Sequence, residues 1–429
     1  MQKLRLIERV YESDYRHEYL GLCTMNIKQG YKQTEIGIIP EDWEVTSLKK
    51  VLSKIIDNRG KTPPYSKDSG IELIESASIS FVNQYPDYSK VNKFVSKSTY
   101  DFWFRGHPVK HDILISTVGE YSGSTAIINE NRGTIAQNLI ALRINELNPN
   151  YVFYWTKSNS FKKQLDQVMM NQAQPSLRVP WLLNFQLIYP LKLQEQTAIA
   201  TALSDIDALI GELDKLIAKK QGIKQATMQQ LLTGKKRLAG FSGEWEVKRL
   251  GEVFGITAGG DLDKSNFSTT KDEKYSFPVY SNSLSDKGLY GYSPTYSQEE
   301  NTITVTARGT VGFANARNHK YSAIGRVLVL SPLEKVSCFF VAEYINNKVS
   351  FANESTGVPQ LTAPQISKYD IILPSYEEQT AIANILSDMD AEISQLEGRH
   401  AKMGELKQGM MQELLTGRIR LNTQESRRC

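Results

Sequence analysis

Two stretches of this sequence decide the fold. QEQTAIATALSDIDALIGELDKLIAKKQGIKQATMQQLLTGKKRL runs from Gln194 to Leu238, and EEQTAIANILSDMDAEISQLEGRHAKMGELKQGMMQELLTGRIRL runs from Glu377 to Leu421. The two stretches align without a gap, and more than half of their positions are identical. A long segment that returns in one chain indicates a repeated structural unit. We therefore interpret the chain as two half-molecules in tandem.

Shorter repeats flank these two stretches. The tripeptide WEV at 43–45 returns at 245–247, and a segment bounded by prolines at 175–190 returns at 359–374. Residues 52–174 and 254–358 resemble each other only in outline. A shared frame with divergent inserts predicts one scaffold that presents two different working surfaces.

Apolar residues in both stretches follow an alternating four-three spacing, which is the heptad pattern of a coiled coil. We expect helices of about 40 residues, or ~60 Å, that pair antiparallel with each other; ordinary core helices of a bundle are the alternative. Gly234 and Gly417 are the expected helix stops, and His400 is expected to be an interface histidine. The predicted pairing positions are Ile199, Leu203, Ile206, Ile210, Leu213, Ile217, Ile382, Leu386, Met389, Ile393, Leu396, His400 and Met403.

The inserts carry short β patterns separated by Gly, Pro, Asn and Ser, so we predict an α+β protein with mostly β domains. Long loops are expected at 57–70 and 259–297. Helices are predicted at 151–170 and 339–352. The predicted strands are 73–74, 113–116, 125–128, 139–144, 187–189, 302–306 and 326–330.

Composition excludes several classes of protein. Hydrophobic residues make up 40% and charged residues 23% of the 429 residues, which is typical of globular domains. No apolar run is long enough to span a membrane, and three scattered cysteines predict a reducing, cytoplasmic setting. The net charge is +4, with roughly +6 on residues 43–193 and roughly zero on 245–376, so a nucleic-acid footprint would be uneven.

Fragments that look catalytic are incomplete. The sequence GKT at 60–62 lacks the earlier glycine of a phosphate-binding loop. The sequence TPPY at 62–65 has threonine where amino methyltransferases carry Asp or Asn, and we interpret it as a binding loop. His107 and His111 have a spacing suited to a metal, but Pro108 separates them and no third ligand is evident. We predict no catalytic centre and no metal site.

Three motifs together resemble the specificity subunits of type I restriction-modification systems: GYKQTEIGIIPEDWEVTSLKKV at 30–51, the two EQTAIA helix starts and the two LLTGxxRL ends. The resemblance covers about 400 residues. It implies a non-catalytic subunit with two target recognition domains that each read half of a bipartite double-stranded DNA target. The repeated helices would set the spacer and dock two methyltransferase subunits. The alternative is a specificity subunit of a related enzyme whose catalytic subunits both methylate and cut.

The resemblance also implies that this chain binds no cofactor. S-adenosylmethionine would be bound by the methyltransferase subunits, and ATP and Mg by restriction subunits. Two competing hypotheses are a self-contained methyltransferase or nuclease, which the missing donor-binding loop argues against, and a structural adaptor without a DNA role. The predicted division is 1–29, an extension that is disordered or mis-assigned; 30–193, recognition domain 1; 194–238, central helix; 239–376, recognition domain 2; 377–421, C-terminal helix; and 422–429, a tail.

Candidate DNA contacts follow from base chemistry, since Arg and Lys suit guanine, Asn and Gln suit adenine, and aromatic groups suit the thymine methyl. Many of them would contact only phosphate. Lys219, Lys224, Lys402 and Lys407 serve either methyltransferase docking or solubility. The DNA candidates are Arg59, Lys61, Arg105, Arg132, Gln137, Asn138 and Arg178 in the first domain, and Tyr290, Tyr292, Arg308, Asn315, Arg317, Arg326 and Gln360 in the second.

Overall fold

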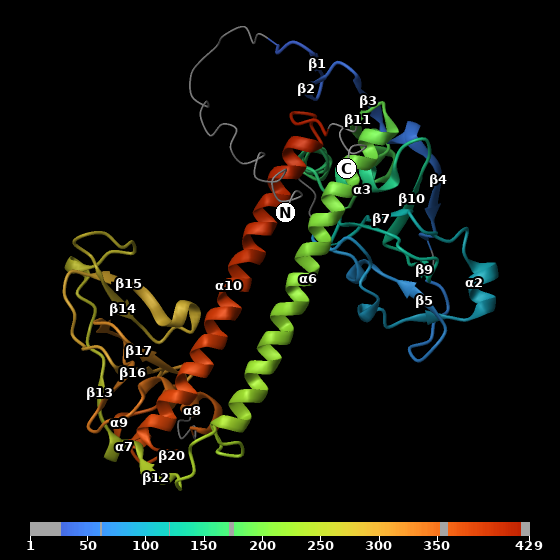
Figure 1. Cartoon of the computed structure of the whole chain (residues 1–429). Helices are drawn as coiled ribbons and strands as arrows, with labels where there is room; N and C mark the ends of the chain where they lie inside the picture. Colours follow the sequence, from blue (N-terminus) through green and yellow to red (C-terminus); the bar gives the residue numbers. More distant parts are fainter. Residues whose placement is uncertain (1–26, 61, 120, 171–175, 352–358, 422–429) are drawn as a thin grey trace. The chain divides into compact units, whose positions relative to one another are not determined.

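A computed structural model describes residues 27–60, 62–119, 121–170, 176–351 and 359–421 (Figure 1). The predictions for residues 1–26, for Lys61 and for the tail at 422–429 lie outside these ranges. The chain divides into two compact units: unit 1 comprises 1–213 and 399–429, and unit 2 comprises 214–398. Within the described ranges, no helix combines the length and apolar character needed to cross a bilayer.

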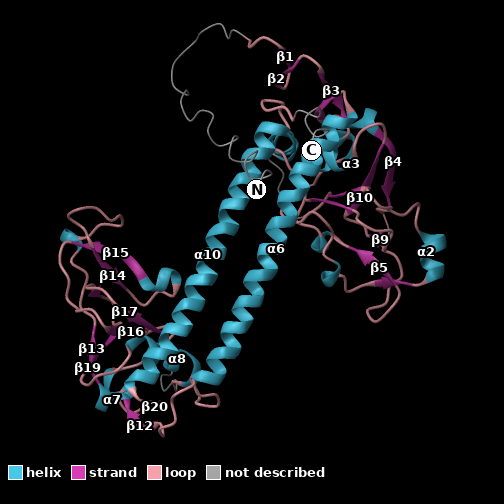
Figure 2. Cartoon of the chain, in the orientation of Figure 1, coloured by secondary structure: helices cyan, strands magenta, loops and turns pink. Residues whose placement is uncertain are grey.

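The two repeated stretches form the long helices α6 (Leu193–Leu231) and α10 (Tyr376–Leu414), of 39 residues each (Figure 2). The division into units falls near the middle of both helices rather than at their ends. In unit 1 the first half of α6 packs against the last turns of α10, because Leu203 and Ile206 share a core with Leu406 and Met410. The α+β class and the long antiparallel helices are thus as predicted.

The predicted pairing positions are buried or half-buried in the unit to which each belongs. The positions nearest the helix starts are the most deeply buried; Ile199 and Leu203 on α6, and Ile382 and Leu386 on α10, are at most 1% exposed. Burial is shallower toward the middle of each helix, where Ile210, Leu213 and Ile217 are only half-buried. The helix starts share a hydrophobic core with the recognition domains.

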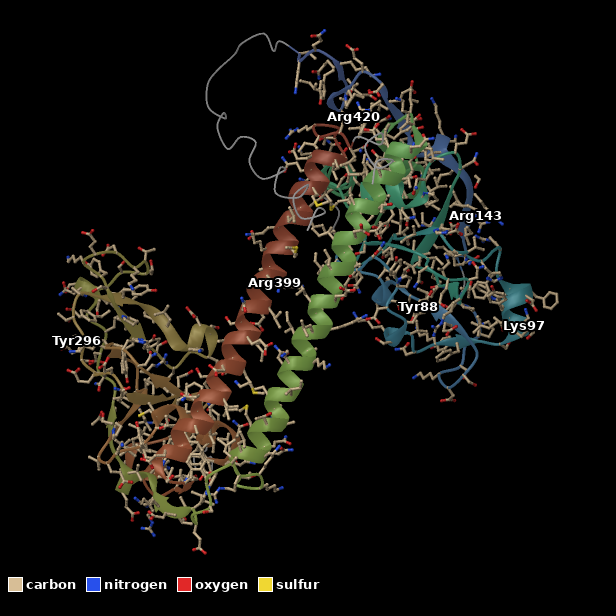
Figure 3. The ribbon with its side chains drawn as sticks, in the orientation of Figure 1. Tyr88, Lys97, Arg143, Tyr296, Arg399 and Arg420 are labelled. Carbon is tan, nitrogen blue, oxygen red and sulfur yellow. The ribbon has the colours of Figure 1, made fainter. Side chains whose placement is uncertain are left out.

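The helix ends carry the same contact in both units. Arg420, which follows α10, donates to both carboxylate oxygens of Glu195 near the start of α6 (Figure 3). Arg237, which follows α6, donates to both oxygens of Glu378 near the start of α10, at 2.6 Å each. These residues are equivalent in the repeat, so each LLTGxxRL end binds the start of the other copy.

The frame of each recognition domain is a two-stranded sheet, and it contains the short repeats. In unit 1, β3 (Trp43–Ser47) pairs antiparallel with β11 (Gln186–Pro190). In unit 2, β12 (Glu246–Arg249) pairs antiparallel with β20 (Asp370–Leu373). The WEV tripeptides therefore lie in equivalent places, next to the start of α6 or α10.

Recognition domain 1 contains a four-stranded antiparallel sheet in the order β4-β10-β7-β8 and a three-stranded sheet in the order β6-β5-β9. A separate hairpin, β1-β2, precedes β3. Its remaining elements are β1 (Tyr31–Thr34), β2 (Gly37–Pro40), β4 (Leu52–Asp57), β5 (Ile71–Ile74), β6 (Phe94–Val95), α2 (Lys97–Trp103), β7 (Ile113–Ser116), β8 (Thr125–Ile127), β9 (Thr134–Ile135), β10 (Leu139–Ile144), α3 (Pro149–Thr156), α4 (Asn159–Met169) and α5 (Val179–Leu182).

Recognition domain 2 repeats this topology, with sheets in the orders β13-β19-β16-β17 and β15-β14-β18. In both domains the last strand of the three-stranded sheet runs parallel to the central one. Its remaining elements are α7 (Leu250–Val253), β13 (Phe254–Ala258), β14 (Phe277–Tyr280), β15 (Leu289–Ser293), β16 (Thr302–Val305), β17 (Ala314–Arg317), β18 (Ser322–Ala323), β19 (Leu328–Pro332), α8 (Cys338–Lys348) and α9 (Ala363–Ile366).

Three local predictions are wrong. The helix expected at 151–170 is two helices, because the Ser158 side chain accepts from the Phe161 amide and starts α4 anew. The loop expected at 259–297 contains β14 and β15, which pair antiparallel with each other. The strand expected from residue 326 begins at Leu328, since Arg326 has a left-handed φ of 68°.

Candidate nucleic-acid interface

One edge of recognition domain 1 brings three segments together at the end of β7. The Thr117 amide donates to the Asn138 carbonyl at 2.8 Å, and the Leu177 amide donates to the Thr117 carbonyl at 2.8 Å. Val118 and Ser176 form a β-bridge beside these bonds. We call this edge 1, comprising 117–119, 137–138 and 176–178.

The same arrangement occurs in recognition domain 2 at the end of β16. The Leu361 amide donates to the Ala307 carbonyl at 2.9 Å, and Arg308 and Gln360 form the matching β-bridge. Asn282 adds a further link, because its side chain accepts from the Ala307 amide and donates to the Gly325 carbonyl. We call this edge 2, comprising 307–309, 325–326 and 359–360.

Several predicted DNA contacts meet at these edges. Asn138 and Arg178 are exposed on edge 1, and the Arg178 guanidinium lies 4.8 Å from the Trp181 ring. Arg308, Arg326 and Gln360 are exposed on edge 2. No carboxylate of the described residues pairs with either arginine of edge 2, so both remain available to an anionic partner.

A pocket of about 170 Å³ adjoins edge 1. The Gln137 amide at its rim donates to the Thr62 hydroxyl at 2.9 Å, which fixes this side chain. Lys93 pairs with Glu75 at 2.8 Å and lies 5.0 Å from the Tyr65 ring. The TPPY segment therefore forms a wall of the pocket. The lining residues are Thr62, Pro63, Tyr65, Leu73, Glu75, Ser76, Lys93, Ala136, Gln137 and Asn138.

Three other arginine candidates of domain 1 are engaged within the domain. Arg59 donates to both oxygens of Asp57, and the hydrogen bond from this guanidinium lowers the pKa of the Asp57 carboxyl. Arg105 donates to the Asp57 and Arg59 carbonyls. Arg132 pairs with Glu72 at 2.8 Å, and its guanidinium stacks over the ring of Tyr88, a residue labelled in Figure 3.

Arg317 corrects one prediction. This residue lies on β17 rather than in a loop and is 4% exposed. Its guanidinium lies 3.5 Å from the Tyr280 ring and donates to the Thr304 hydroxyl and the Lys287 carbonyl. Burial lowers the pKa of Arg317. Arg317 therefore holds the loop at 285–288 on the sheet, and little of its side chain is exposed.

The remaining candidates of domain 2 differ in exposure. Tyr290 is exposed and stacks near Phe267 at 5.4 Å between ring centroids, whereas Tyr292 and Asn315 lie half-buried within strands. Sequence patterns did not reveal Asn282, which joins two segments of edge 2. A single asparagine in a polar loop carries no signal until the fold places its neighbours.

His107 and His111, the two histidines considered as metal ligands, occupy structural positions. His107 stacks on Tyr100 with ring centroids 3.6 Å apart, and its Nδ1 lies 2.9 Å from the Thr134 hydroxyl. Burial lowers the pKa of His107. His111 stands in a turn with a φ of 74°. Within the described ranges, no three His, Cys, Asp or Glu side chains are grouped as metal ligands.

Two lysines proposed as exposed docking residues instead join the helices within a unit. Lys224 pairs with Asp390 at 2.5 Å, and Lys407 pairs with Asp207 at 2.6 Å. Both lysine side chains are only 18% exposed, because each ion pair holds the lysine against the other helix. Lys219 and Lys402 are exposed.

Comparison with known proteins agrees with this architecture. Residues 40–225 and 242–402 match the type I restriction modification DNA specificity domain. The putative type I restriction enzyme MjaX specificity subunit of Methanocaldococcus jannaschii is 30% identical over 92% of this chain and 98% of its own length. A putative type I specificity subunit of Mycoplasma pneumoniae is 28% identical over 47% of this chain and 53% of its own.

A solved structure shares the fold. The crystal structure of a type I restriction-modification system S subunit from M. genitalium superposes with a TM-score of 0.62 over 87% of this chain and 96% of its own length, at 14% identity. Most of the first match lies in unit 1, and most of the second lies in unit 2. The chain belongs to the family of type I restriction-modification specificity subunits.

Proposed function

We propose that this chain gives a type I restriction-modification complex its DNA sequence specificity, with each recognition domain reading one half of a bipartite target. The observation that carries the proposal is the pair of equivalent edges. They share the backbone contacts of Thr117–Leu177 and Ala307–Leu361, yet they present different side chains. Edges that share backbone contacts but carry different polar side chains are suited to reading different bases in a DNA groove.

In this proposal the long helices set the gap between the two half-sites. A 39-residue helix is ~50–60 Å long, which corresponds to ~15 base pairs at ~3.4 Å each. The reciprocal arginine-carboxylate contacts at both ends resist sliding of one helix along the other, because sliding would separate buried charges. Spacer length would then be a property of helix length.

The catalytic steps belong to partner subunits in this proposal. Two methyltransferase subunits would dock on the helices and carry S-adenosylmethionine, and restriction subunits would use ATP and Mg. Lys219 and Lys402 are exposed on the helices and suit such docking. We expect this complex to be cytoplasmic, because its substrate is chromosomal DNA. The alternative is a set of catalytic subunits that both methylate and cut.

Methylation mapping tests the proposal. Co-expression with the cognate methyltransferase subunit should place N6-methyladenine at one bipartite motif, and omission of this chain should remove that methylation. Exchange of residues 52–174 for the insert of another family member should change one half of the motif and leave the other half unchanged. If the methylated motif stays the same after the exchange, this segment does not read DNA sequence, and the result favours a structural adaptor.

A second experiment tests the spacer. Seven residues inserted into each helix, at 213/214 and at 398/399 where the chain passes between units, preserve the heptad pattern and both terminal contacts. The insertion adds ~10.5 Å, so the gap in the motif should widen by ~3 base pairs. If the gap in the motif does not change, the helices do not set the spacer length.

A further inference from the structure

The turn that enters β10 in domain 1 has a counterpart that enters β19 in domain 2. In domain 1 the Leu139 amide donates to the Ala136 carbonyl, and the turn contains Gln137 and Asn138. In domain 2 the Val327 amide donates to the Ile324 carbonyl, and the turn contains Gly325 and Arg326. Asn138 and Arg326 thus hold the same position in the two turns, although only Arg326 has a left-handed φ.

Neighbouring strands confirm this equivalence. The Ala136 amide donates to the Ile74 carbonyl of β5, and the Ile324 amide donates to the Tyr280 carbonyl of β14, at 2.9 Å in both cases. The strands that follow the turns also correspond, because β10 pairs with β7 as β19 pairs with β16. The correspondence therefore rests on hydrogen bonds rather than on sequence identity.

The fold holds the backbone of both turns. The Asn138 carbonyl accepts from the amide and the hydroxyl of Thr117, at 2.8 and 3.2 Å. The Gly325 carbonyl accepts from Asn282, which is itself bonded to the Ala307 amide. A fixed backbone positions the side chain that it carries and lowers the entropy cost of a specific contact.

Neither side chain takes part in a structural contact of the kind that holds the two turns, within the described ranges. Both Asn138 and Arg326 are exposed, and no hydrogen bond or ion pair engages either side chain among the described residues. Arg326 also has a φ of 68°, which is unfavourable for a residue with a Cβ. Gly325 beside it, with a φ of 66°, adopts the same conformation without strain. A strained backbone conformation at an arginine motivates the hypothesis that its guanidinium has a function.

We infer that Asn138 and Arg326 are the equivalent base-reading residues of the two domains. Asn138 contacts adenine in one half-site, and Arg326 contacts guanine in the other. An amide presents a donor and an acceptor to adenine N7 and N6, and a guanidinium presents two donors to guanine O6 and N7. This inference rests on the proposed function and adds to it the residue and base class at each half-site.

Methylation mapping of the full complex tests the inference with Asn138→Ala and Arg326→Asn. Asn138→Ala should relax one adenine position in one half of the motif by about tenfold or more in relative methylation. Arg326→Asn should replace guanine by adenine, or relax that position, only in the other half. Asparagine tolerates the left-handed conformation, so the turn is preserved.

Three controls separate folding and phosphate binding from base reading. Arg326→Gly should melt at or above the temperature of the unmodified chain while losing guanine discrimination, because glycine removes the backbone strain. Arg249→Gln on β12 and Lys110→Gln at the opposite end of β7 remove an exposed charge outside both edges and should leave the motif unchanged.

Two outcomes would overturn the inference. If Arg326→Asn lowers methylation equally at all sites, Arg326 contacts a phosphate. If the motif is unchanged in both variants, other residues read the bases. Either result requires that the unmodified chain direct methylation to a bipartite motif. Failure of the unmodified chain to do so would instead reject the proposed function.

Discussion

Arg420 shows how one residue closes unit 1. Its guanidinium donates to Glu195 and, at 2.8 and 2.9 Å, to Asp42, and it lies over the Trp43 ring. The hydrogen bonds that Arg420 donates to both carboxylates raise its pKa. A residue after the last helix is thereby joined to the start of α6 and to the segment that precedes β3.

Removal of this guanidinium should destabilise unit 1. Glu195 is 6% exposed, so Arg420→Ala leaves a buried carboxylate without its cation. We expect a loss of about 2–3 kcal/mol in unfolding free energy, since Arg420 itself remains partly in water. Urea denaturation measures the change. Addition of Glu195→Gln to Arg420→Ala should recover part of the loss; an additive second loss would show that the pair is not coupled.

Lys157 is a buried cation with an unusual set of partners. Its ammonium lies within 3.2 Å of four backbone carbonyl oxygens, from Ser80, Phe81, Asn83 and Thr125. Burial, and secondarily the Lys407 ammonium, lower the pKa of Lys157 to about 7, while Asp207 opposes this shift. The contacts tie the loop at 80–83 to α3.

The low pKa of Lys157 predicts a pH dependence of stability. Between about pH 7 and the ordinary lysine pKa of 10.5, the unfolded chain holds this proton and the folded chain releases it. Stability should therefore rise with pH across this window. Urea denaturation at several pH values measures the slope. Lys157→Met should reduce the slope as well as the stability; equal slopes in both proteins would show that Lys157 does not titrate there.

At the scale of elements, a turn after each long helix determines where the helix ends. Gly234 and Gly417 have φ values of 66° and 71°, three residues beyond the last helical residue. In unit 1 this turn also packs tightly, since a Cβ on Gly417 would lie 2.5 Å from Pro40 Cγ. The glycine thus permits both the reversal and the close approach of the β2 end.

Gly417→Ala should lower the stability of unit 1 more than backbone strain alone explains. A left-handed alanine costs about 1 kcal/mol, and the contact with Pro40 should bring the loss to about 2 kcal/mol or more. Gly240→Ala is the matched control, because its φ is 90° and no atom lies within 4 Å of the added Cβ. Thermal unfolding compares the two variants; equal losses would rule out the packing role of Gly417.

At the scale of the whole molecule, the charge is distributed unevenly between two recognition domains of the same topology. Residues 43–193 of domain 1 carry roughly +6, and residues 245–376 of domain 2 carry roughly zero. Several of the arginines in domain 1 are paired with carboxylates, such as Arg59 with Asp57. With a net charge of only +4 on the whole chain, binding to DNA should release few counterions.

This distribution predicts weak DNA binding by the isolated chain. Affinity for a duplex that contains the target should be low, and it should fall only modestly as salt rises from 50 to 200 mM, because the modest net charge releases few counterions. Fluorescence anisotropy over a salt series measures this dependence. Addition of the methyltransferase subunits should give a tighter and specific complex. A salt-insensitive, sub-nanomolar complex of the chain alone would contradict the prediction.

The sequence alone determined the architecture of this protein. The repeated stretches carry the heptad spacing, the glycine stops and the terminal Arg and Glu residues in one continuous segment each, so periodicity was sufficient to predict two long helices. The short β segments 113–116 and 139–144 were also predictable, because they are mostly apolar. Helix ends and strands are local properties of the chain.

Only the tertiary structure decided which polar side chains share a surface. Arg317 and Arg326 are the same residue type nine residues apart, yet one is buried under Tyr280 and the other is exposed on edge 2. Asn138 and Arg326 became comparable only through hydrogen bonds to distant strands. The physical reason is that base-reading positions depend on long-range backbone pairing and burial, which hydrophobic periodicity along the chain does not encode.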